Sequence, residues 1–477
     1  MKLVYNVNEK PSFSKNLIYA FQQLLAIIAA TVLVPLLVMG QTPGATAELS
    51  QASALIGAGV GTIVYLLFTR FKSPVFLGSS FAFITPLCTG VLYGYCGVIL
   101  GSIFAGLVYV VIAIIIKFVG SDWITKLMPP VIIGPTVALI GLSLSGSAIN
   151  NVCNTAVSAA NYNLLHILVG LITLFVTVIV SVKGSKGMKL IPFVIGVGAG
   201  YVAALIITLI GWNLAGSEYC KLIDFSAFEQ VGNFANWLPN IIVVGAFKEI
   251  FNGGVQVDGK AIVEILLAFA PVALVVFAEH VADHKNISSI IEKDLLKDPG
   301  LDKTLLGDGV GSIAGSIVGG CPNTTYGESV GCVAITGNAS VHTIFTTAIM
   351  CIVLAFIYPV MLFIQTIPGC VVGGISIALY GFIAVSGLRM FKNVDLDNSK
   401  NLFIVAGILV TGIGGLTLKF AGITISSVAC ALIIGILLNV ILKPSAAEVT
   451  KTVSVEGDKE KEATMFGDVY NEKKDEE

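Results

Sequence analysis

Long apolar runs recur along the whole chain. Fourteen runs of about twenty residues begin near residues 16, 49, 76, 97, 128, 164, 188, 262, 305, 322, 341, 367, 401 and 421. An α-helix of this length crosses roughly 30 Å of hydrocarbon. The first run is too long and too well continued to be a cleaved signal peptide. The pattern therefore predicts an all-α polytopic membrane protein with fourteen transmembrane segments.

The distribution of cationic residues supports this count, because cytoplasmic loops collect Lys and Arg while translocated loops do not. If the runs alternate in direction, the loops on one side hold Lys2, Lys10, Lys15, Arg70, Lys72, Lys117, Lys126, Lys183, Lys186, Lys189, Lys285, Lys293, Lys297, Lys303, Arg389, Lys392 and Lys400. The other side receives only Lys221, Lys248, Lys260 and Lys419. We therefore expect both termini in the cytoplasm and a location in a cell membrane, such as a bacterial inner membrane.

Composition agrees with a lipid solvent. Of the 477 residues, 56% are hydrophobic and 12% are charged, about half the charged fraction of a soluble domain. The nine cysteines show no metal-binding spacing, so no metal is expected. No other cofactor and no nucleic-acid partner is expected. Cys153 and Cys220 both fall in loops on the outer side, where a disulfide bond between them is an open alternative.

Two stretches about 240 residues apart read alike. Residues 128–146 begin MPPVIIG and residues 367–387 begin IPGCVVG, and both end in Ser-Gly. With fourteen spans, each half of the chain holds seven. An odd number places the second copy upside down in the membrane, and such inverted repeats are typical of secondary transporters.

Each half also has a break in its third span. Residues 76–86 (FLGSSFAFITP) and 322–328 (PNTTYGE) are rich in residues that favour extended backbone, Gly and Pro. Extended backbone inside a bilayer must find hydrogen-bond partners, so we expect two short antiparallel β-strands, in spans 3 and 10. The half helices that follow would direct free N–H groups at one central point. Ordinary packing of Gly and Ser between helices is the alternative interpretation.

Two acidic residues, Glu279 and Glu328, fall within these apolar regions. A charge at bilayer depth costs roughly 2.5 to 3.5 kcal/mol, so it usually marks a ligand site or a relay. Asp283 follows Glu279 by four residues and lies on the same helical face. This spacing favours a proton-coupling role for Glu279, Asp283 and Glu328.

Other titratable residues have weaker signals. His280 and His284 flank the carboxylates, and a structural role for each stays open beside a functional one. Glu264 and Asp308 fall at presumed span ends. There we expect a carboxylate to remain hydrated or to cap a helix.

These groups suit a small planar ligand. Carboxylate acceptors and backbone donors around one cavity complement a ring with two N–H donors and two carbonyl acceptors, as in uracil. Phe81, Tyr326 and Tyr380 are candidates for lining the faces of such a ring. A carboxylate that gains its proton on one side and loses it on the other couples transport to a proton gradient. Na⁺ coupling through backbone carbonyls stays an alternative.

Four motifs together carry a resemblance to a known family. They are GSSFAF at 78–83, AEHV at 278–281, PNTTYGE at 322–328 and LYG at 379–381. Within residues 10–442 they resemble the nucleobase:cation symporter family, which includes bacterial uracil permeases and the nucleobase and ascorbate transporters. The resemblance implies a transporter rather than an enzyme. It also implies uracil import by proton symport, an elevator-type motion and a homodimer in the lipid bilayer.

The resemblance also implies a site and a division into domains. Residues matching the family's substrate site are Glu279, Glu328, Phe81 and Gly327 through their backbone N–H groups, with Ser80, Ala30, Tyr326 and Tyr380. The implied core domain comprises residues 15–120 (spans 1–4) and 259–363 (spans 8–11). The implied gate domain comprises residues 121–211 (spans 5–7) and 364–442 (spans 12–14). An N-terminal cytoplasmic tail (1–14), an outer linker (212–258) and a disordered cytoplasmic tail (443–477) complete the chain.

Three positions depart from the family pattern. Gln23 stands where uracil permeases can have His, Ser329 stands where Asn is common, and Asp283 replaces a His. Glu328 after Thr-Thr-Tyr-Gly favours uracil over xanthine or urate, because purine carriers often have Gln at that position. A purine permease nevertheless stays the main alternative.

Two further classes are weaker alternatives. A sulfate or bicarbonate transporter of the same fold would place its anion beside Glu279 and Glu328, which would repel it. The sequence Leu306-Gly307-Asp308-Gly309 resembles the Gly-Asp motif of intramembrane aspartyl proteases, but no companion Tyr-Asp motif precedes it.

Overall fold

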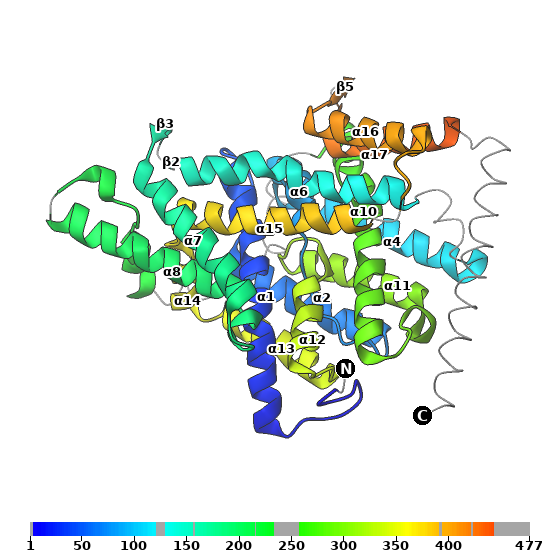
Figure 1. Ribbon diagram of the computed structural model, residues 1–477, viewed down its shortest axis with the longest axis horizontal. Helices are drawn as coiled ribbons and strands as arrows, with labels where there is room; N and C mark the ends of the chain where they lie inside the picture. The colour runs from blue at the N-terminus through cyan, green and yellow to red at the C-terminus, as the bar shows by residue number, and fades with distance from the viewer. Residues whose placement is uncertain are drawn as a thin grey trace, which may run out of the picture.

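The computed structural model describes residues 3–120, 129–155, 158–214, 216–232, 257–390, 394–420 and 423–442. Helices make up most of this described chain (Figure 1). The expected tail 443–477 and most of the expected outer linker 212–258 lie outside these residues.

Fifteen α-helices and six short strands organise the described chain. The helices are α1 (Phe13–Gln41), α2 (Gln51–Phe68), α3 (Ile84–Gly90), α4 (Gly94–Val119), α6 (Pro130–Cys153), α7 (Leu164–Lys183), α8 (Pro192–Ile207), α10 (Gly259–Ile291), α11 (Leu301–Ile317), α12 (Gly327–Thr336), α13 (Val341–Ala355), α14 (Tyr358–Gln365), α15 (Gly369–Met390), α16 (Ser399–Ile413) and α17 (Ser427–Ile441). The strands are β1 (Leu77–Ser79), β2 (Asn154–Thr155), β3 (Ser158–Tyr162), β4 (Asn323–Thr325), β5 (Leu418–Phe420) and β6 (Ile423–Ile425).

Each of the fourteen predicted apolar runs contains a helix. Eight described helical stretches are long and apolar enough to cross a membrane, and α13 with α14, bent by 78°, can make a ninth. The half helix α12 has 10 residues and rises about 15 Å, half of the hydrocarbon core. The protein is therefore a multi-pass membrane protein, and fourteen spans in two inverted repeats stay a prediction.

Helices α6 and α15, which contain the two similar stretches, lie side by side (Figure 1). A Cβ atom at Gly387 would collide with the α6 backbone at Gly134 and Ala138, and one at Gly141 would collide with the carbonyl of Tyr380. These contacts make the two helices antiparallel. Close backbone approach through small residues is common where helices pack in lipid. The two similar stretches of the sequence thus pack against each other along one long helix–helix interface.

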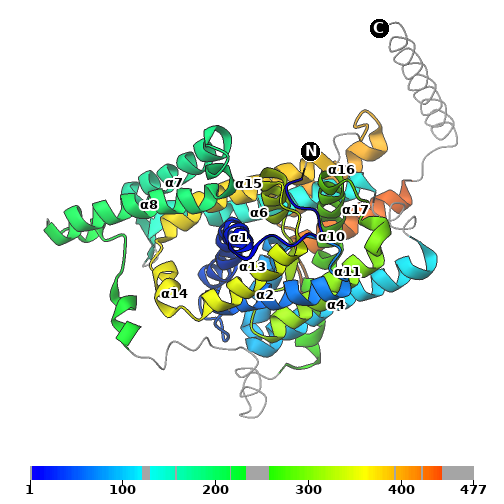
Figure 2. The ribbon, with the colours of Figure 1, turned by 90° about the horizontal axis from the view of Figure 1, so that it is seen from below.

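Helix α1 stands between two groups of helices. Seen from below, α1 is nearly end-on, with α2 and α13 on one side and α8 on the other (Figure 2). Part of the expected N-terminal tail is docked beside α13. The Val4 N–H donates to the Gly337 carbonyl at 2.8 Å, and the Ala339 N–H donates to the Tyr5 carbonyl at 2.9 Å.

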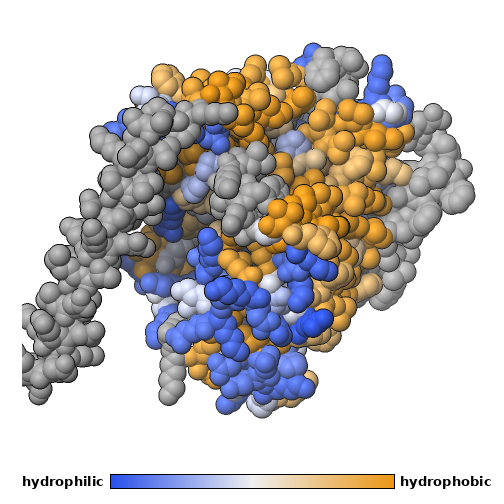
Figure 3. Space-filling model, turned by 90° about the vertical axis from the view of Figure 1, so that its right-hand side faces the viewer, coloured by the Kyte–Doolittle hydropathy of each residue, from blue (hydrophilic) through white to orange (hydrophobic). Residues whose placement is uncertain are grey.

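The molecular surface carries extensive apolar area. Hydrophobic residues cover much of the face in Figure 3, while hydrophilic residues gather toward its lower end. Along α4, Leu107, Val111, Ile114 and Phe118 are all exposed. Their spacing places them on one helical face. A large exposed apolar face marks contact with membrane or protein partners, and lipid contact is the expected environment here.

Candidate functional site

The two predicted breaks meet at the centre of the fold. Strands β1 and β4 form an antiparallel pair, which confirms the expected pairing of the two broken spans. Its register joins Leu77 to Thr325, Gly78 to Thr324 and Ser79 to Asn323.

Side chains of neighbouring helices satisfy the outer edges of this two-stranded sheet. The Leu77 N–H donates to Thr62 Oγ1 of α2 at 3.0 Å. The Asn323 N–H donates to Ser312 Oγ of α11 at 2.9 Å. Backbone polar groups in lipid must be satisfied internally, so Thr62 and Ser312 make the extended segments tolerable at this depth.

Tyr326 locks the strand pair to the next turn. Its hydroxyl donates to the Ser79 carbonyl at 2.9 Å, and its N–H donates to the Phe76 carbonyl at 3.0 Å. Its ring lies so close to Gly78 that a Cβ atom there would collide with it. Glycine is therefore required at position 78 by the packing of Tyr326.

Both strands lead directly into helical turns. β1 is followed by the short 3-10 helix η1 (Phe81–Phe83) and then α3, while β4 is followed by α12. The first N–H groups of a helix have no partner within it. The Phe81 and Gly327 N–H groups stand at these two starts, as the sequence predicted.

A cavity of about 80 Å³ lies at the meeting point of these elements. Six of the predicted substrate residues line it: Ser80, Phe81, Glu279, Tyr326, Gly327 and Glu328. Glu279 comes from α10 and Glu328 from the first turn of α12. The structure thus brings together both carboxylates and both helix starts around one small volume.

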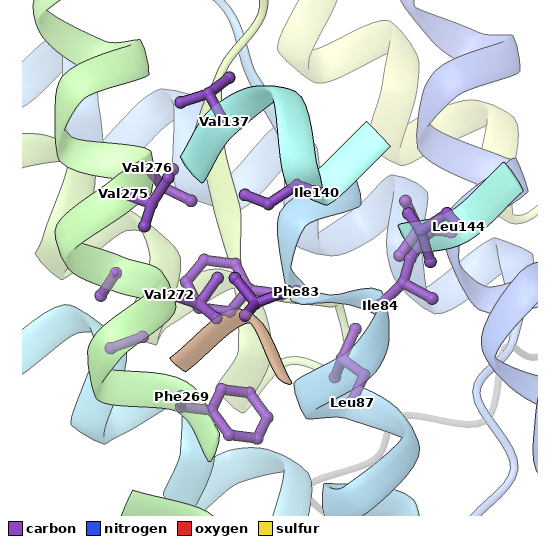
Figure 4. Close-up of a cluster of buried hydrophobic side chains, with 14 of the residues drawn as sticks. Phe83, Ile84, Leu87, Val137, Ile140, Leu144, Phe269, Val272, Val275 and Val276 are labelled. Carbon is purple, nitrogen blue, oxygen red and sulfur yellow. The ribbon is translucent and has the colours of Figure 1, made fainter. Parts of the chain in front are cut away.

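Part of the cavity lining is apolar. Val137 and Ile140 of α6 and Val275 of α10 belong to it. Behind them, Phe83 of η1 stacks against Phe269 of α10 with ring centroids 5.9 Å apart, and α3, α6 and α10 all contribute to this cluster (Figure 4). An apolar lining lowers the local dielectric constant and so strengthens the polar interactions made in the same cavity.

Sequence reasoning missed the cavity residues of α6 and α15. These are Val137, Ile140, Leu379, Phe382 and Ile383. Apolar residues give no local signal that separates a cavity wall from a core or a lipid-facing surface. The similarity of residues 128–146 and 367–387 was the available indication, because both stretches form the wall.

Two of the predicted substrate residues stand behind the cavity lining. Tyr380 is buried and packs edge-on against Phe81, with ring centroids 6.4 Å apart. Ala30 of α1 is buried in the same apolar cluster as Tyr326. Thr31, its neighbour in the sequence, donates from Oγ1 to the Tyr326 hydroxyl at 3.4 Å. In this structure Tyr380 and Ala30 therefore lie next to cavity-lining residues and do not line the cavity themselves.

Asp283, predicted for proton coupling, also lies behind the lining. Thr325 of β4 donates from Oγ1 to Asp283 Oδ2 at 2.8 Å. The other oxygen, Oδ1, lies 3.7 Å from where a Cβ atom of Gly327 would stand. Asp283 thus contacts the strand and helix start that carry Glu328, one helical turn from Glu279.

Two of the departures from the family pattern contact each other. The Gln23 side chain donates from Nε2 to Ser329 Oγ at 2.5 Å. Ser329 Oγ also accepts the Phe76 N–H at 3.2 Å. Gln23 of α1 is therefore connected through Ser329 to the chain just before β1 and to the residue after Glu328.

Asp308 differs from expectation. It was expected to be hydrated or to cap a helix, but it is fully buried, because α11 begins seven residues earlier at Leu301. Its Oδ2 lies 2.7 Å from His280 Nδ1, and His280 Nε2 lies 3.1 Å from Thr304 Oγ1. The pair joins α10 to α11, and His280 is the residue that follows Glu279 in the sequence.

His284 makes a second buried connection from α10. Its Nε2 lies 2.7 Å from the Tyr65 hydroxyl of α2, and Nδ1 donates to the His280 carbonyl at 2.8 Å. The rings of His280 and His284 stack at 4.1 Å. Both histidines thus have a structural role in fixing α10 against α2 and α11.

Glu264 is partly exposed near the start of α10, where it accepts a hydrogen bond of 2.7 Å from the Tyr93 hydroxyl.

Cys153 and Cys220 are both free thiols. Within the described residues, no group of three or more His, Cys, Asp or Glu side chains is arranged to hold a metal ion.

A sequence model of the Permease family (Xan_ur_permease) matches residues 14–420. The chain belongs to this family. The uracil permease of Bacillus caldolyticus is 37% identical over 453 residues, which cover 94% of this chain and 97% of that protein. The uracil permease of Bacillus subtilis (strain 168) is 34% identical over 457 residues, again 94% and 97% of the two chains. These relatives are named permeases, which are transporters and not enzymes.

A solved structure shares the fold of this permease family member. The transmembrane domain of the cyanobacterium bicarbonate transporter BicA superposes with a TM-score of 0.55 at 15% identity. The match covers 91% of this chain and 100% of that domain. The likeness is one of fold. Together with the relatives, it confirms a polytopic nucleobase permease of the family indicated by the motifs at 78–83, 278–281, 322–328 and 379–381.

Proposed function

We propose that this permease imports uracil together with a proton. The observation that carries the proposal is the cavity in which Glu279 and Glu328 face the starts of η1 and α12. The carboxylates accept hydrogen bonds from the two ring N–H groups. The Phe81 and Gly327 N–H groups donate to the ring carbonyls, with Phe81 and Tyr326 against the ring faces. The names of the relatives support uracil as the substrate.

Two considerations favour uracil over the alternative substrates. The names of the relatives favour uracil over xanthine or urate. Bicarbonate and sulfate are anions, and Glu279 with Glu328 would repel them at close range. Sharing a fold with a bicarbonate transporter therefore does not imply that this chain carries bicarbonate.

Proton coupling rests on the carboxylates of the cavity. Glu279 and Glu328 share one cavity with an apolar wall, where two ionised carboxylates repel and a shared proton relieves the repulsion. Asp283, tied to β4 through Thr325, passes the proton to and from this pair. Uracil is neutral, so each cycle moves one charge, worth about 2.3 kcal/mol per 100 mV. Na⁺ is the alternative coupling ion.

For alternating access we propose the movement of one domain against another. We place the core domain at residues 15–120 and 259–363 and the gate domain at 121–211 and 364–442, in two inverted repeats of seven spans. The antiparallel contact of α6 with α15 supports this symmetry. Core movement past the gate in an elevator-type motion then exposes the cavity to each side in turn. The permease works as a homodimer in a bacterial inner membrane, with both termini cytoplasmic.

Uptake by the purified full chain in proteoliposomes tests the substrate and the ion together. Radiolabelled uracil is offered under an inward proton gradient or an inward Na⁺ gradient, with unlabelled xanthine, urate and bicarbonate as competitors. We expect accumulation under the proton gradient alone, abolished by an uncoupler and inhibited by unlabelled uracil only. Accumulation driven by Na⁺ would replace the proton as coupling ion, and uptake of labelled xanthine without uracil would reassign the substrate.

A further inference from the structure

A second hollow lies on the surface beside α1, away from the carboxylate cavity. This α1 groove has a volume of about 560 Å³. Leu17, Ile18, Phe21 and Gln22 of α1, Met350 of α13 and Gly187 from the turn between α7 and α8 line it. It shares no lining residue with the carboxylate cavity. Figure 2 shows α1 nearly end-on, between the helix groups that border the groove.

The lining of the α1 groove is open and apolar. Leu17, Ile18 and Phe21 are exposed by 43%, 59% and 50%. Gln22 is the sole polar side chain in the lining. In a multi-pass membrane protein, such a surface meets lipid chains rather than water, because apolar side chains of this size are unfavourable in water. The groove therefore has room and chemistry for an acyl chain.

Two exposed lysines lie next to Gly187, a lining residue of the α1 groove, in the sequence. Lys186 precedes Gly187, and Lys189 follows it by two residues, and both lysines are exposed. Lys183 and Lys15 are also exposed close by in the sequence. No acidic residue occurs between residues 183 and 191. An apolar groove with exposed lysines beside one of its lining residues combines the two features by which proteins hold anionic lipids.

We propose that the α1 groove binds an anionic phospholipid with a phosphatidylglycerol-type headgroup. Its phosphate faces Lys186 and Lys189, one acyl chain lies against Leu17, Ile18 and Phe21, and the Gln22 amide bonds to the glycerol region. Charge complementarity selects this occupant, because a zwitterionic lipid presents no net charge to the lysines.

The position of this lipid links it to transport. It contacts α1 and α13 on one side and the turn between α7 and α8 on the other. These two groups of helices belong to the core and gate domains under the proposed function. A lipid that bridges them acts on their relative motion, so the anionic lipid content of the membrane sets the transport rate. Binding itself does not depend on uracil.

Native mass spectrometry of the purified full chain tests the binding. The chain is titrated with phosphatidylglycerol and, separately, with phosphatidylethanolamine of the same acyl chains, without uracil. The double variant Lys186→Gln, Lys189→Gln is compared with Lys293→Gln, Lys297→Gln, which removes the same charge from other exposed lysines. Each lysine near a membrane surface contributes about 1 kcal/mol toward anionic lipid, a factor of about five.

We expect the wild type to bind phosphatidylglycerol in preference to phosphatidylethanolamine. The variant at 186 and 189 should lose roughly 25-fold in phosphatidylglycerol affinity, from the product of two factors of about five. The variant at 293 and 297 should bind as the wild type does. Equal retention of both lipids, or equal losses in both variants, would overturn the proposal. These results are read without transport, so they stand or fall separately from uracil import.

Discussion

Thr325 on strand β4 donates a hydrogen bond of 2.8 Å from Oγ1 to Asp283 Oδ2 on helix α10. The next residues after Thr325 are Tyr326, Gly327 and Glu328, three of the cavity residues. Asp283 is one helical turn from Glu279 on α10. This single hydrogen bond therefore connects the two elements that carry the cavity carboxylates, and it holds the predicted relay residue in a fixed position.

Thr325→Val removes this donor while keeping the shape of the side chain. A hydrogen bond to a charged group is worth about 1.5 to 3 kcal/mol, so we expect uracil uptake to fall roughly tenfold or more and its pH dependence to shift. Thr325→Ser keeps the hydroxyl and should retain uptake within about twofold. Initial rates across a pH series measure both effects. Equal behaviour of the Val and Ser variants would show that the contact with Asp283 does not matter.

Gly78→Ala introduces a Cβ atom into the ring of Tyr326. Because the β1–β4 pair cannot shift without losing backbone hydrogen bonds, we expect loss of uracil binding together with a lower thermal unfolding temperature. Gly331→Ala in α12 is the matched control, since a Cβ atom there meets nothing within 4 Å. That change should be neutral or slightly stabilising, because Ala favours helix over Gly by about 1 kcal/mol. Calorimetric binding of uracil and thermal unfolding in detergent distinguish the two variants.

Gln23→Ala and Ser329→Ala break the same connection from opposite ends. We expect each single variant to weaken uracil binding, because Ser329 also holds the Phe76 N–H ahead of strand β1. The double variant should be little worse than the weaker single variant, with a coupling of about 1 kcal/mol. Strictly additive losses in a double-mutant cycle would mean that the two side chains act independently.

Asp308→Ala leaves His280 without its buried partner. Removing one member of a buried ion pair typically costs about 3 to 5 kcal/mol, while replacing both members by apolar residues of similar volume costs less. We therefore expect Asp308→Ala to lower the thermal unfolding temperature more than the double variant His280→Phe, Asp308→Leu does. A double variant that unfolds at a lower temperature than Asp308→Ala would contradict this account of the pair.

The sequence predicted the strand breaks and the carboxylates at the centre of this protein better than the apolar residues that line the cavity. The breaks at 76–86 and 322–328 were predictable because Gly, Pro and residues that favour extended backbone interrupt apolar runs. Glu279 and Glu328 were predictable because charge is costly at that depth. The strand register was not predictable, since it depends on partners such as Thr62 and Ser312 from other helices.

Other features could not be read from the sequence, for physical reasons. Phe382 and Ile383 line the cavity, yet such apolar residues occupy core, cavity and lipid-facing positions alike. Gln23 and Ser329 are 306 residues apart, so their contact depends on how α1 packs against α12. The depth of Asp308 was misjudged because an uncertain helix start moves a residue from the membrane surface to the interior.

Uracil uptake by carboxylate variants tests whether Glu279 and Glu328 hold uracil and its proton. Proteoliposomes containing the wild type, Glu279→Gln or Glu328→Gln are given radiolabelled uracil with the outside acidic, with and without an uncoupler. Glu264→Gln serves as the control, because Glu264 lies outside the cavity lining. We expect both cavity variants to lose uncoupler-sensitive accumulation while Glu264→Gln retains it. Accumulation like that of the wild type in both cavity variants would contradict a role for these carboxylates in holding uracil and its proton.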